Sequence, residues 1–392
     1  MDFIKLNNYF KTLLDTKNYA EAHKVINDML LNYQDNPCSY LNAALLESID
    51  IKKNVFDFDL INTYLEKSLQ VKKPNVELTN LCKKDIALNY IVFFALNYAL
   101  AYKANNNGSY NVRYFKEQFN LIKDDKERNN AAIRVLFESL NQRAKAIHEF
   151  SIACKNDFAT DITTASNRED IANRHFNLIC DNYSMLGVIF DFINDFSMLS
   201  EFVNIWKKVN KSVYEIPTEF SYRGVSTTYG ISSYGTFYSE DSEYKGEFTT
   251  SIPNELINAS RKLLSKVCSG INHISELKTE DESELNKKAE VVKVLEEINV
   301  LNEECDKLSS DEKKIRNAAN ELSSELQSLK LNKKSFVKKN GKAAYKDKVK
   351  SIKLALKNSN KNYYKDIAAN KADVRKCNES LNEALKTFFL SF

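Results

Sequence analysis

The residue types best suited to chemistry in this chain are four histidines and a few closely spaced thiols and carboxylates. His23, His148, His175 and His273 lie far apart, and none belongs to an H-E-x-x-H motif or to a Cys/His spacing typical of zinc. Cys180 follows His175 by little more than one helical turn, which is the nearest approach to a nucleophile beside a base. A helix-surface histidine near a buried cysteine explains this pair better.

One pair of carboxylates and one group of glycines also need to be considered. Asp191 and Asp195 are spaced to share a helix face, where they could hold a metal ion, but no second pair or histidine is near them. The glycines between 224 and 246 are not followed by the Lys-Ser/Thr of a phosphate-binding loop. Residues 230–235 do not match the G-x-S-x-G nucleophile elbow. The sequence therefore predicts no catalytic residues, no cofactor and no metal, hence a non-enzymatic protein.

The composition predicts a mostly α-helical chain. Only four prolines and eight glycines occur in 392 residues, so long regular segments must dominate. The formal net charge of +3 is small for this length and gives no global field that would attract nucleic acid.

The cysteines and the first residues bear on the cellular compartment. The cysteines are odd in number and scattered, which is typical of reduced thiols in the cytoplasm. No basic stretch followed by an apolar run occurs at the start, so we expect no signal peptide. The seven cysteines are Cys38, Cys82, Cys154, Cys180, Cys268, Cys305 and Cys377.

One uncharged segment, residues 86–102, has to be tested as a membrane span. A helix of this length covers about 26 Å, which is at the short limit for a bilayer core. Asn89 and Asn97 lie within it, and asparagine in lipid needs partners. We therefore expect a helix buried in a helical domain and no integral membrane insertion, with contact to lipid as the alternative.

The first 75 residues contain an internal repeat. In residues 18–37 a tyrosine, small alanines and a terminal proline recur at set distances, and a second copy ends at Pro74. This pattern resembles the second helix and exit turn of tetratricopeptide repeats. The resemblance implies stacked helix pairs with a partner-binding concave face, on which Asn7 and Lys11 match ligand-facing positions. Because about three repeats are needed to bury such a stack, we expect helices at about 78–103 and 111–152 to continue it.

The middle of the chain has two parts. Ser166 followed by Glu169 forms a capping box that predicts a helix start, and helical sequence continues to about 212. Residues 213–252 are rich in aromatic and β-branched residues between glycines, which favours a β-hairpin insertion. A disordered loop is the alternative for this segment.

The last third of the chain has the strongest pattern. From Val291 to Leu329 apolar residues recur in alternating steps of three and four, and a second series runs from Tyr345 to Phe388. Thr279 and Glu282 form a capping box at the start, and residues 332–342 with Asn340-Gly341 interrupt the helix. Two arms joined by a short loop predict a long antiparallel coiled-coil hairpin.

The charges of the two arms are opposite in sign. Residues 331–392 hold sixteen Lys/Arg against five Asp/Glu, a balance of +11, while residues 276–330 hold nine against fifteen, a balance of −6. Side by side, the arms would neutralise much of each other, so nucleic-acid binding by the basic arm is only an alternative. The tip is not neutralised in this way, because no acidic residue lies between Lys330 and Tyr345. We expect an acidic partner to contact Phe336, Lys333, Lys334, Lys338, Lys339 and Lys342.

Together these patterns predict three domains. A helical-repeat-like domain covers residues 1–154, a helical domain with a β insertion covers 155–276, and the coiled-coil hairpin covers 277–392. Long exposed helical surfaces suit a cytoplasmic interaction or scaffold protein that binds other proteins. A membrane-acting protein and a nucleic-acid-binding accessory protein are the alternatives, and Phe336 could simply close the hairpin.

Overall fold

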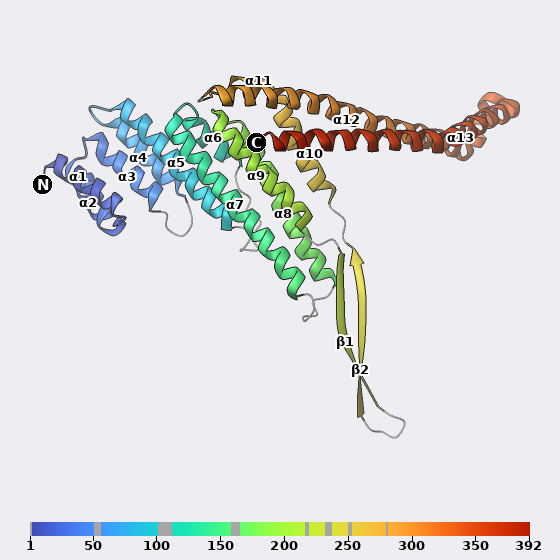
Figure 1. The fold of residues 1–392 in the computed structure, drawn as a ribbon, viewed down its shortest axis with the longest axis horizontal. Coiled ribbons are helices and arrows are strands. Elements are labelled where there is room, and N and C mark those ends of the chain that lie inside the picture. The colour runs from blue at the N-terminus through green and yellow to red at the C-terminus, as the bar shows by residue number, and fades with distance from the viewer. Residues whose placement is uncertain are drawn as a thin grey trace. The chain divides into compact units, whose positions relative to one another are not determined.

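The chain is mostly α-helical, as its composition predicts (Figure 1). This computed structural model describes residues 2–50, 56–100, 112–157, 165–215, 219–231, 237–249, 253–279 and 281–392. The chain divides into two compact units, Met1–Leu263 and Leu264–Phe392.

The first unit is a stack of helices. Consecutive helices pack against one another, and α3, α5, α7 and α9 also pack onto each other in turn. Between them, α4, α6 and α8 each contact the odd-numbered helices on either side. α3, α5, α7 and α9 therefore form a continuous layer. The elements are α1 (Phe3–Asp15), α2 (Tyr19–Asn32), α3 (Pro37–Ile49), α4 (Phe58–Gln70), α5 (Val76–Leu100), α6 (Val112–Ile122), α7 (Lys126–Asp157), α8 (Ala165–Phe190) and α9 (Phe196–Glu215).

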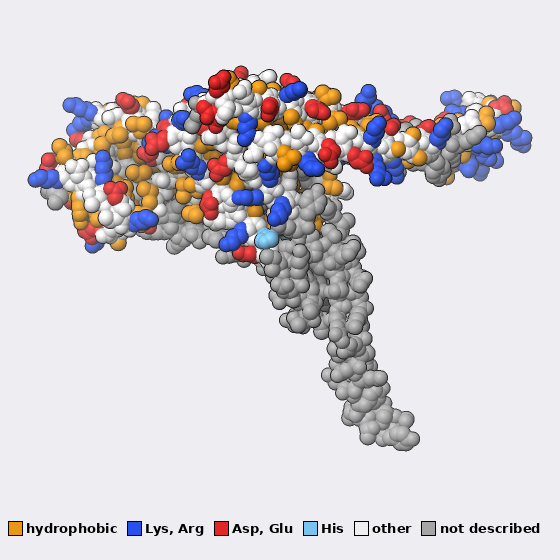
Figure 2. Space-filling view, viewed as in Figure 1, with side chains coloured by type: hydrophobic (Ala, Val, Ile, Leu, Met, Phe, Trp, Pro, Cys, Tyr) orange, Lys and Arg blue, Asp and Glu red, His pale blue; other side chains and the backbone are white. Residues whose placement is uncertain are grey.

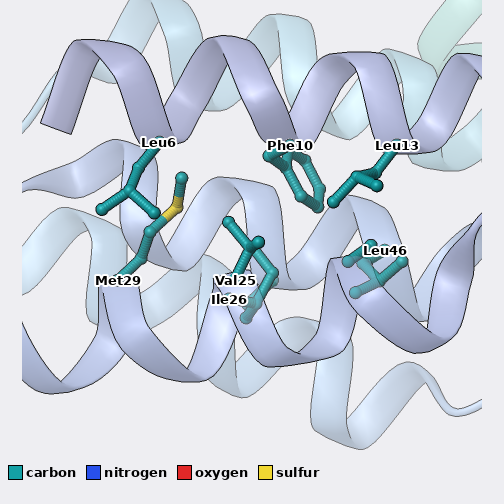
Figure 3. Close-up of a cluster of buried hydrophobic side chains, with 9 residues drawn as sticks. Leu6, Phe10, Leu13, Val25, Ile26, Met29 and Leu46 are labelled. Atoms are coloured by element: carbon teal, nitrogen blue, oxygen red, sulfur yellow. The ribbon is translucent and has the colours of Figure 1, made fainter. Parts of the chain in front are cut away.

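The start of the stack shows how the sequence positions these helices. Buried side chains spaced by three or four residues give each helix an apolar face, because that spacing brings residues to one side of an α-helix. Between α1 and α2 the chain turns at Lys17, which has a φ of 56°, and the side chain of Asn18 accepts a hydrogen bond from the Glu21 amide at 3.3 Å. The cluster that joins the first three helices contains Leu6, Phe10, Leu13, Val25, Ile26, Met29 and Leu46 (Figure 3).

Two of the predicted helical stretches are interrupted. The stretch expected at 111–152 is α6 and α7, and the Asp125 side chain accepts a hydrogen bond from the Arg128 amide at 3.3 Å between them. The stretch expected to run to about 212 is α8 and α9, with Asp195 accepting from the Met198 amide at 2.9 Å. Each aspartate satisfies an amide at a helix start and so favours a new helix there. The expectation that Asp191 and Asp195 share a helix face is therefore wrong. The side chains of the Ser166–Glu169 capping box lie outside the described residues.

The uncharged segment that begins at residue 86 lies in α5, inside the helical stack. Ile91 and Phe94 are buried, and Asn89 donates a hydrogen bond to the Ser48 hydroxyl at 2.8 Å. Asn97 donates to the carbonyl of Phe93 at 2.9 Å. The expectation of a buried helix is confirmed for the described residues of this segment.

After α9 the structure places two paired strands. β1 (Glu219–Ile231) and β2 (Phe237–Thr249) are antiparallel, with Glu219 opposite Thr249 and Ile231 opposite Phe237. The side chains of this segment lie outside the described part of the chain.

The second unit contains the two longest helices. α10 (Asn254–Ser269) ends in this unit and is followed by α11 (Ile271–Glu276), α12 (Glu282–Leu331) and α13 (Lys333–Leu390). The cap of α12 is Asp281, whose side chain accepts a hydrogen bond from the Glu284 amide at 2.8 Å, and the predicted cap at Thr279 is wrong. Asp281 is two residues closer to the first helical turn, where a carboxylate also interacts favourably with the helix dipole.

The antiparallel pairing of these two helices is confirmed (Figure 1). Near the tip, the Lys348 ammonium lies 3.2 Å from the Glu325 carboxylate, and farther away Asn370 donates to the carbonyl of Leu308 at 3.0 Å. The buried residues of α12 keep steps of three and four, but Leu295 and Asn302 are buried where Val294 and Leu301 were expected, so the prediction is wrong at these two positions. The most buried members of the seam are Val291, Leu295, Ile298, Asn302, Cys305 and Leu329 of α12 and Ile352, Ile367, Asn370, Cys377, Leu381, Ala384 and Phe388 of α13.

Two cysteines of the seam form a disulfide. Cys305 and Cys377 are joined across α12 and α13, with their α-carbons 5.9 Å apart. The expectation that all seven cysteines are reduced is therefore wrong for this pair, because the hairpin brings two seam positions face to face. Disulfides are typical of oxidising compartments, and the cytoplasmic location stays a prediction. The free cysteines among the described side chains are Cys38, Cys82, Cys180 and Cys268.

Candidate interaction surface

The hairpin reverses direction through a short helical segment bounded by two breaks. Asn332 separates α12 from α13, and within α13 Gly341 has a φ of 84° and a ψ of 161°. Residues 333–340 between these breaks are helical, so the expectation that residues 332–342 interrupt the helix throughout is wrong. A positive φ is readily adopted only by glycine, which is why the second break falls at Gly341. We call residues 331–342 the tip.

Phe336 faces the second arm of the hairpin. Its ring is half-buried and meets the Tyr345 ring edge-on, with 6.1 Å between centroids. The Lys333 ammonium lies 5.8 Å from the centre of the Tyr345 ring, within the range of a cation–π interaction. These contacts are the ones expected if Phe336 helps to close the hairpin.

The five predicted lysines are all exposed at the tip. Figure 2 shows basic side chains gathered at the far end of the hairpin. Among the described residues, none of the five forms an ion pair, whereas Lys348, farther along α13, is paired with Glu325. Lys348 is thus paired with the acidic arm, while these exposed lysines have no such pair among the described residues: Lys333, Lys334, Lys338, Lys339 and Lys342.

An exposed leucine at the tip was not found from the sequence. Leu331 ends α12 and is 86% exposed. It follows the buried Leu329 by two residues, which places it away from the seam. That displacement from the heptad positions is the signal that could have identified it. The tip therefore combines uncovered positive charge with an apolar side chain in water.

The two other predicted site residues belong to the first unit. Asn7 of α1 is half-buried, and its side-chain oxygen accepts a hydrogen bond from Asn42 of α3 at 2.7 Å. Lys11 is exposed. Burial raises the pKa of the Cys38 thiol, and the positive charge of Lys11 offsets part of that rise. Asn7 is thus engaged within the protein, while Lys11 is accessible to a partner.

The Asn7–Asn42 contact is the first of a series that we call the odd-helix ladder. Each successive pair of odd-numbered helices in the stack is joined by a side-chain hydrogen bond. The remaining rungs are Asn89 to Ser48 at 2.8 Å, Arg128 to Asp85 at 2.7 Å, and Lys208 to Asn141 at 2.7 Å.

A buried arginine, also missed in the sequence, ties α5 to α7 and α8. Arg143 is 1% exposed and donates to the Asn182 side chain at 2.7 Å, to the carbonyl of Tyr98 at 2.9 Å and to that of Leu178 at 3.2 Å. Its guanidinium carbon lies 3.9 Å from the centre of the Tyr98 ring. Arg143 thus contacts both the carbonyl and the ring of Tyr98, which lies in the last turn of α5. This charge is structural.

His23 of α2 contacts two carboxylates. Its Nε2 atom lies 2.8 Å from an Asp50 carboxylate oxygen, and its Nδ1 atom lies 3.8 Å from a Glu47 carboxylate oxygen.

In the part of the chain that the structure describes, no three His, Cys, Asp or Glu side chains are grouped so as to hold a metal ion. Within the same residues, no helix has the length and hydropathy needed to cross a bilayer. Comparison of the chain with protein-family models, with curated proteins and with solved structures finds no match.

Proposed function

We propose that this protein is a non-enzymatic interaction protein, which binds a protein partner on its helical stack and an anionic partner at the tip of its hairpin. The observation behind this proposal is the set of five exposed tip lysines without ion pairs among the described residues. Like charges held close together repel one another, so an anionic partner lowers the energy of this arrangement.

The length and the exposed surface of the hairpin support a role in binding another macromolecule. α12 has 50 residues, which corresponds to about 75 Å of helix. Its buried side chains lie in the seam with α13 and, near its start, against α10 and α11, while Glu296, Lys307 and Lys313 are among its exposed residues. A two-helix hairpin of this kind has no enclosed core in which to build a catalytic pocket, and its function is expected at its surface.

The stack supports the second contact. In this proposal α1 to α4 form two tetratricopeptide-like repeats, and the packing of consecutive helices on one another supports it. On α1, Ile4 is 66% exposed and Tyr9 is 44% exposed, and Lys11 is exposed nearby in the sequence. Apolar side chains exposed beside a lysine suit a protein partner better than a small molecule.

Site-specific photo-crosslinking in the native cell tests this proposal. A photoreactive residue is placed at Lys334 in the tip or at Tyr9 on α1, and matched exposed controls carry it at Glu296 of α12 or Glu66 of α4. We expect each test position to give an adduct that is absent from its control, identified by mass spectrometry. Identical adduct patterns at test and control positions would contradict the proposal.

A further inference from the structure

We infer that the anionic partner of the tip is the surface of a lipid bilayer that contains anionic headgroups. This inference rests on the proposed function, since it assumes that the tip binds an anion, and it names the chemistry of that anion. Three observations on the tip favour a bilayer over an acidic protein or a nucleic acid.

The first observation is the type of basic residue. Between Arg316 and Arg375 the chain contains only lysine as a cation. Arginine is preferred where a protein recognises phosphate or guanine by paired hydrogen bonds in fixed geometry, whereas lysine acts as a point charge on a flexible stem. Lysines without arginine suit the diffuse potential of an anionic membrane, to which each contributes about a fivefold gain in affinity.

The second observation is the distribution of the lysines around the tip. Lys333, Lys334, Lys338 and Lys339 belong to one short helical segment, and at about 100° per residue they occupy roughly two thirds of its circumference. A folded acidic protein would contact one side of this segment. A fluid layer of headgroups can surround the end of the hairpin and reach all four.

The third observation is the placement of the apolar groups. Leu331 is 86% exposed beside the lysines, and the boundary between headgroups and acyl chains would bury it. The aromatic ring of the tip, Phe336, packs on Tyr345. It is therefore not displayed as a platform for stacking nucleic-acid bases.

The test is sedimentation of the full-length protein with vesicles of phosphatidylcholine, with and without about 30% phosphatidylserine. We expect the protein to sediment only with the anionic vesicles, and less at about 0.5 M salt than at about 0.05 M. Changing the five tip lysines to Gln should weaken vesicle binding by at least about 100-fold. A control with the same change in charge, made at Lys293, Lys307, Lys313, Lys371 and Lys376, should bind like the wild type.

A single substitution distinguishes binding to a membrane from binding to another anion. Leu331→Ser should weaken binding to anionic vesicles by about tenfold while leaving the salt dependence unchanged, because it removes only an apolar contact.

If the five-lysine variant does not fold, as judged by circular dichroism, Lys338→Gln replaces it, and this variant should bind anionic vesicles about fivefold more weakly than the wild type.

The outcomes separate the inference from the function on which it rests. Equal binding to neutral and anionic vesicles, or none to either, overturns the inference. If the protein does not bind anionic vesicles while the photoreactive residue at 334 captures a protein or an RNA, the tip binds an anion of another class and the proposed function stands. If the protein neither binds anionic vesicles nor gives an adduct at residue 334, the tip has no anionic partner.

Discussion

Cys305 of α12 and Cys377 of α13 are bonded to each other across the hairpin, so that the whole tip lies within a covalent loop. The two residues are 72 positions apart in the chain. A crosslink over such a distance restricts the unfolded chain strongly. We therefore expect reduction of the bond to lower the free energy of unfolding of the hairpin by about 2–4 kcal/mol.

Urea unfolding with and without reductant, followed by helical circular dichroism, measures this difference. The variant with Cys305→Ser and Cys377→Ser is the control, and reductant should not change its unfolding. Peptide mapping under non-reducing conditions should recover the bridged pair from the wild type. Free thiols at both positions in freshly purified protein would contradict the assignment.

The seam predicts a sharp contrast between two neighbouring residues of α12. Ile298 is fully buried, whereas Val300 is 63% exposed. Ile298→Ala leaves a cavity and removes apolar contacts, so it should cost about 2–4 kcal/mol of unfolding free energy. Val300→Ala should change it by less than about 0.5 kcal/mol. Similar losses from both variants, measured by urea unfolding, would show that the hairpin does not pack along this seam.

A dependence on pH is expected at the start of α7. Burial raises the pKa of Asp125, but hydrogen bonds from Arg128 and the charges of Arg128 and Lys84 outweigh it and hold that pKa below its ordinary value. A carboxyl with a lowered pKa stabilises the folded state when it is ionised. This stability is present above the ordinary pKa of about 3.9 and is lost as the pH falls through the folded-state value.

Asp125→Asn keeps a cap but removes the charge. Compared with the wild type, it should lower the free energy of unfolding by up to about 1 kcal/mol at pH near 7. The difference should shrink as the pH falls below about 4, where the wild-type carboxyl also becomes neutral. Denaturant unfolding at both pH values checks this, and a difference that persists in acid would exclude an electrostatic cause.

The sequence predicted those parts of the fold that depend on repeated local patterns. The apolar steps from Val291 to Leu329 are sufficient to predict α12 and its partner, because a helix must bury such a stripe. The same patterns hid the break at Asp195, because apolar residues continue on both sides of it and only the capping geometry shows that a new helix begins there. At Asp125 the polar run of residues 123–130 was the visible signal of a break, and the cap places the new helix.

The disulfide could not be predicted for a related reason. Glu325 of α12 lies beside Lys348 of α13. Counting back from Glu325 to Cys305, and the same number of residues forward from Lys348, reaches residue 368 and not Cys377, to which Cys305 is bonded. Sliding one arm by about seven residues keeps apolar side chains in the seam, so heptads alone do not select the register. Arg143 was missed because nothing in its neighbourhood along the chain indicates that its partners come from α5 and α8.

Of the candidate site, the sequence identified the lysines and not the leucine. Charge is visible in composition, and the lack of acidic residues around Phe336 was enough to locate the tip. The displacement of Leu331 from the heptad positions is visible in the sequence, but the extent of its exposure depends on how α12 packs against α13. The direction of Phe336 likewise depends on the short helical segment between Asn332 and Gly341.

The odd-helix ladder has a consequence for how a disturbance spreads through the first unit. Each rung joins only two adjacent odd-numbered helices, so the loss of one rung is felt mainly by its immediate neighbours. Removing Asn42 costs α1 one contact of about 1 kcal/mol, while Leu6, Phe10 and Leu13 still hold this helix in the apolar cluster. Removing Asn89 weakens an internal junction by a similar amount, and the packing of α3 on α5 keeps the helices before and after it together.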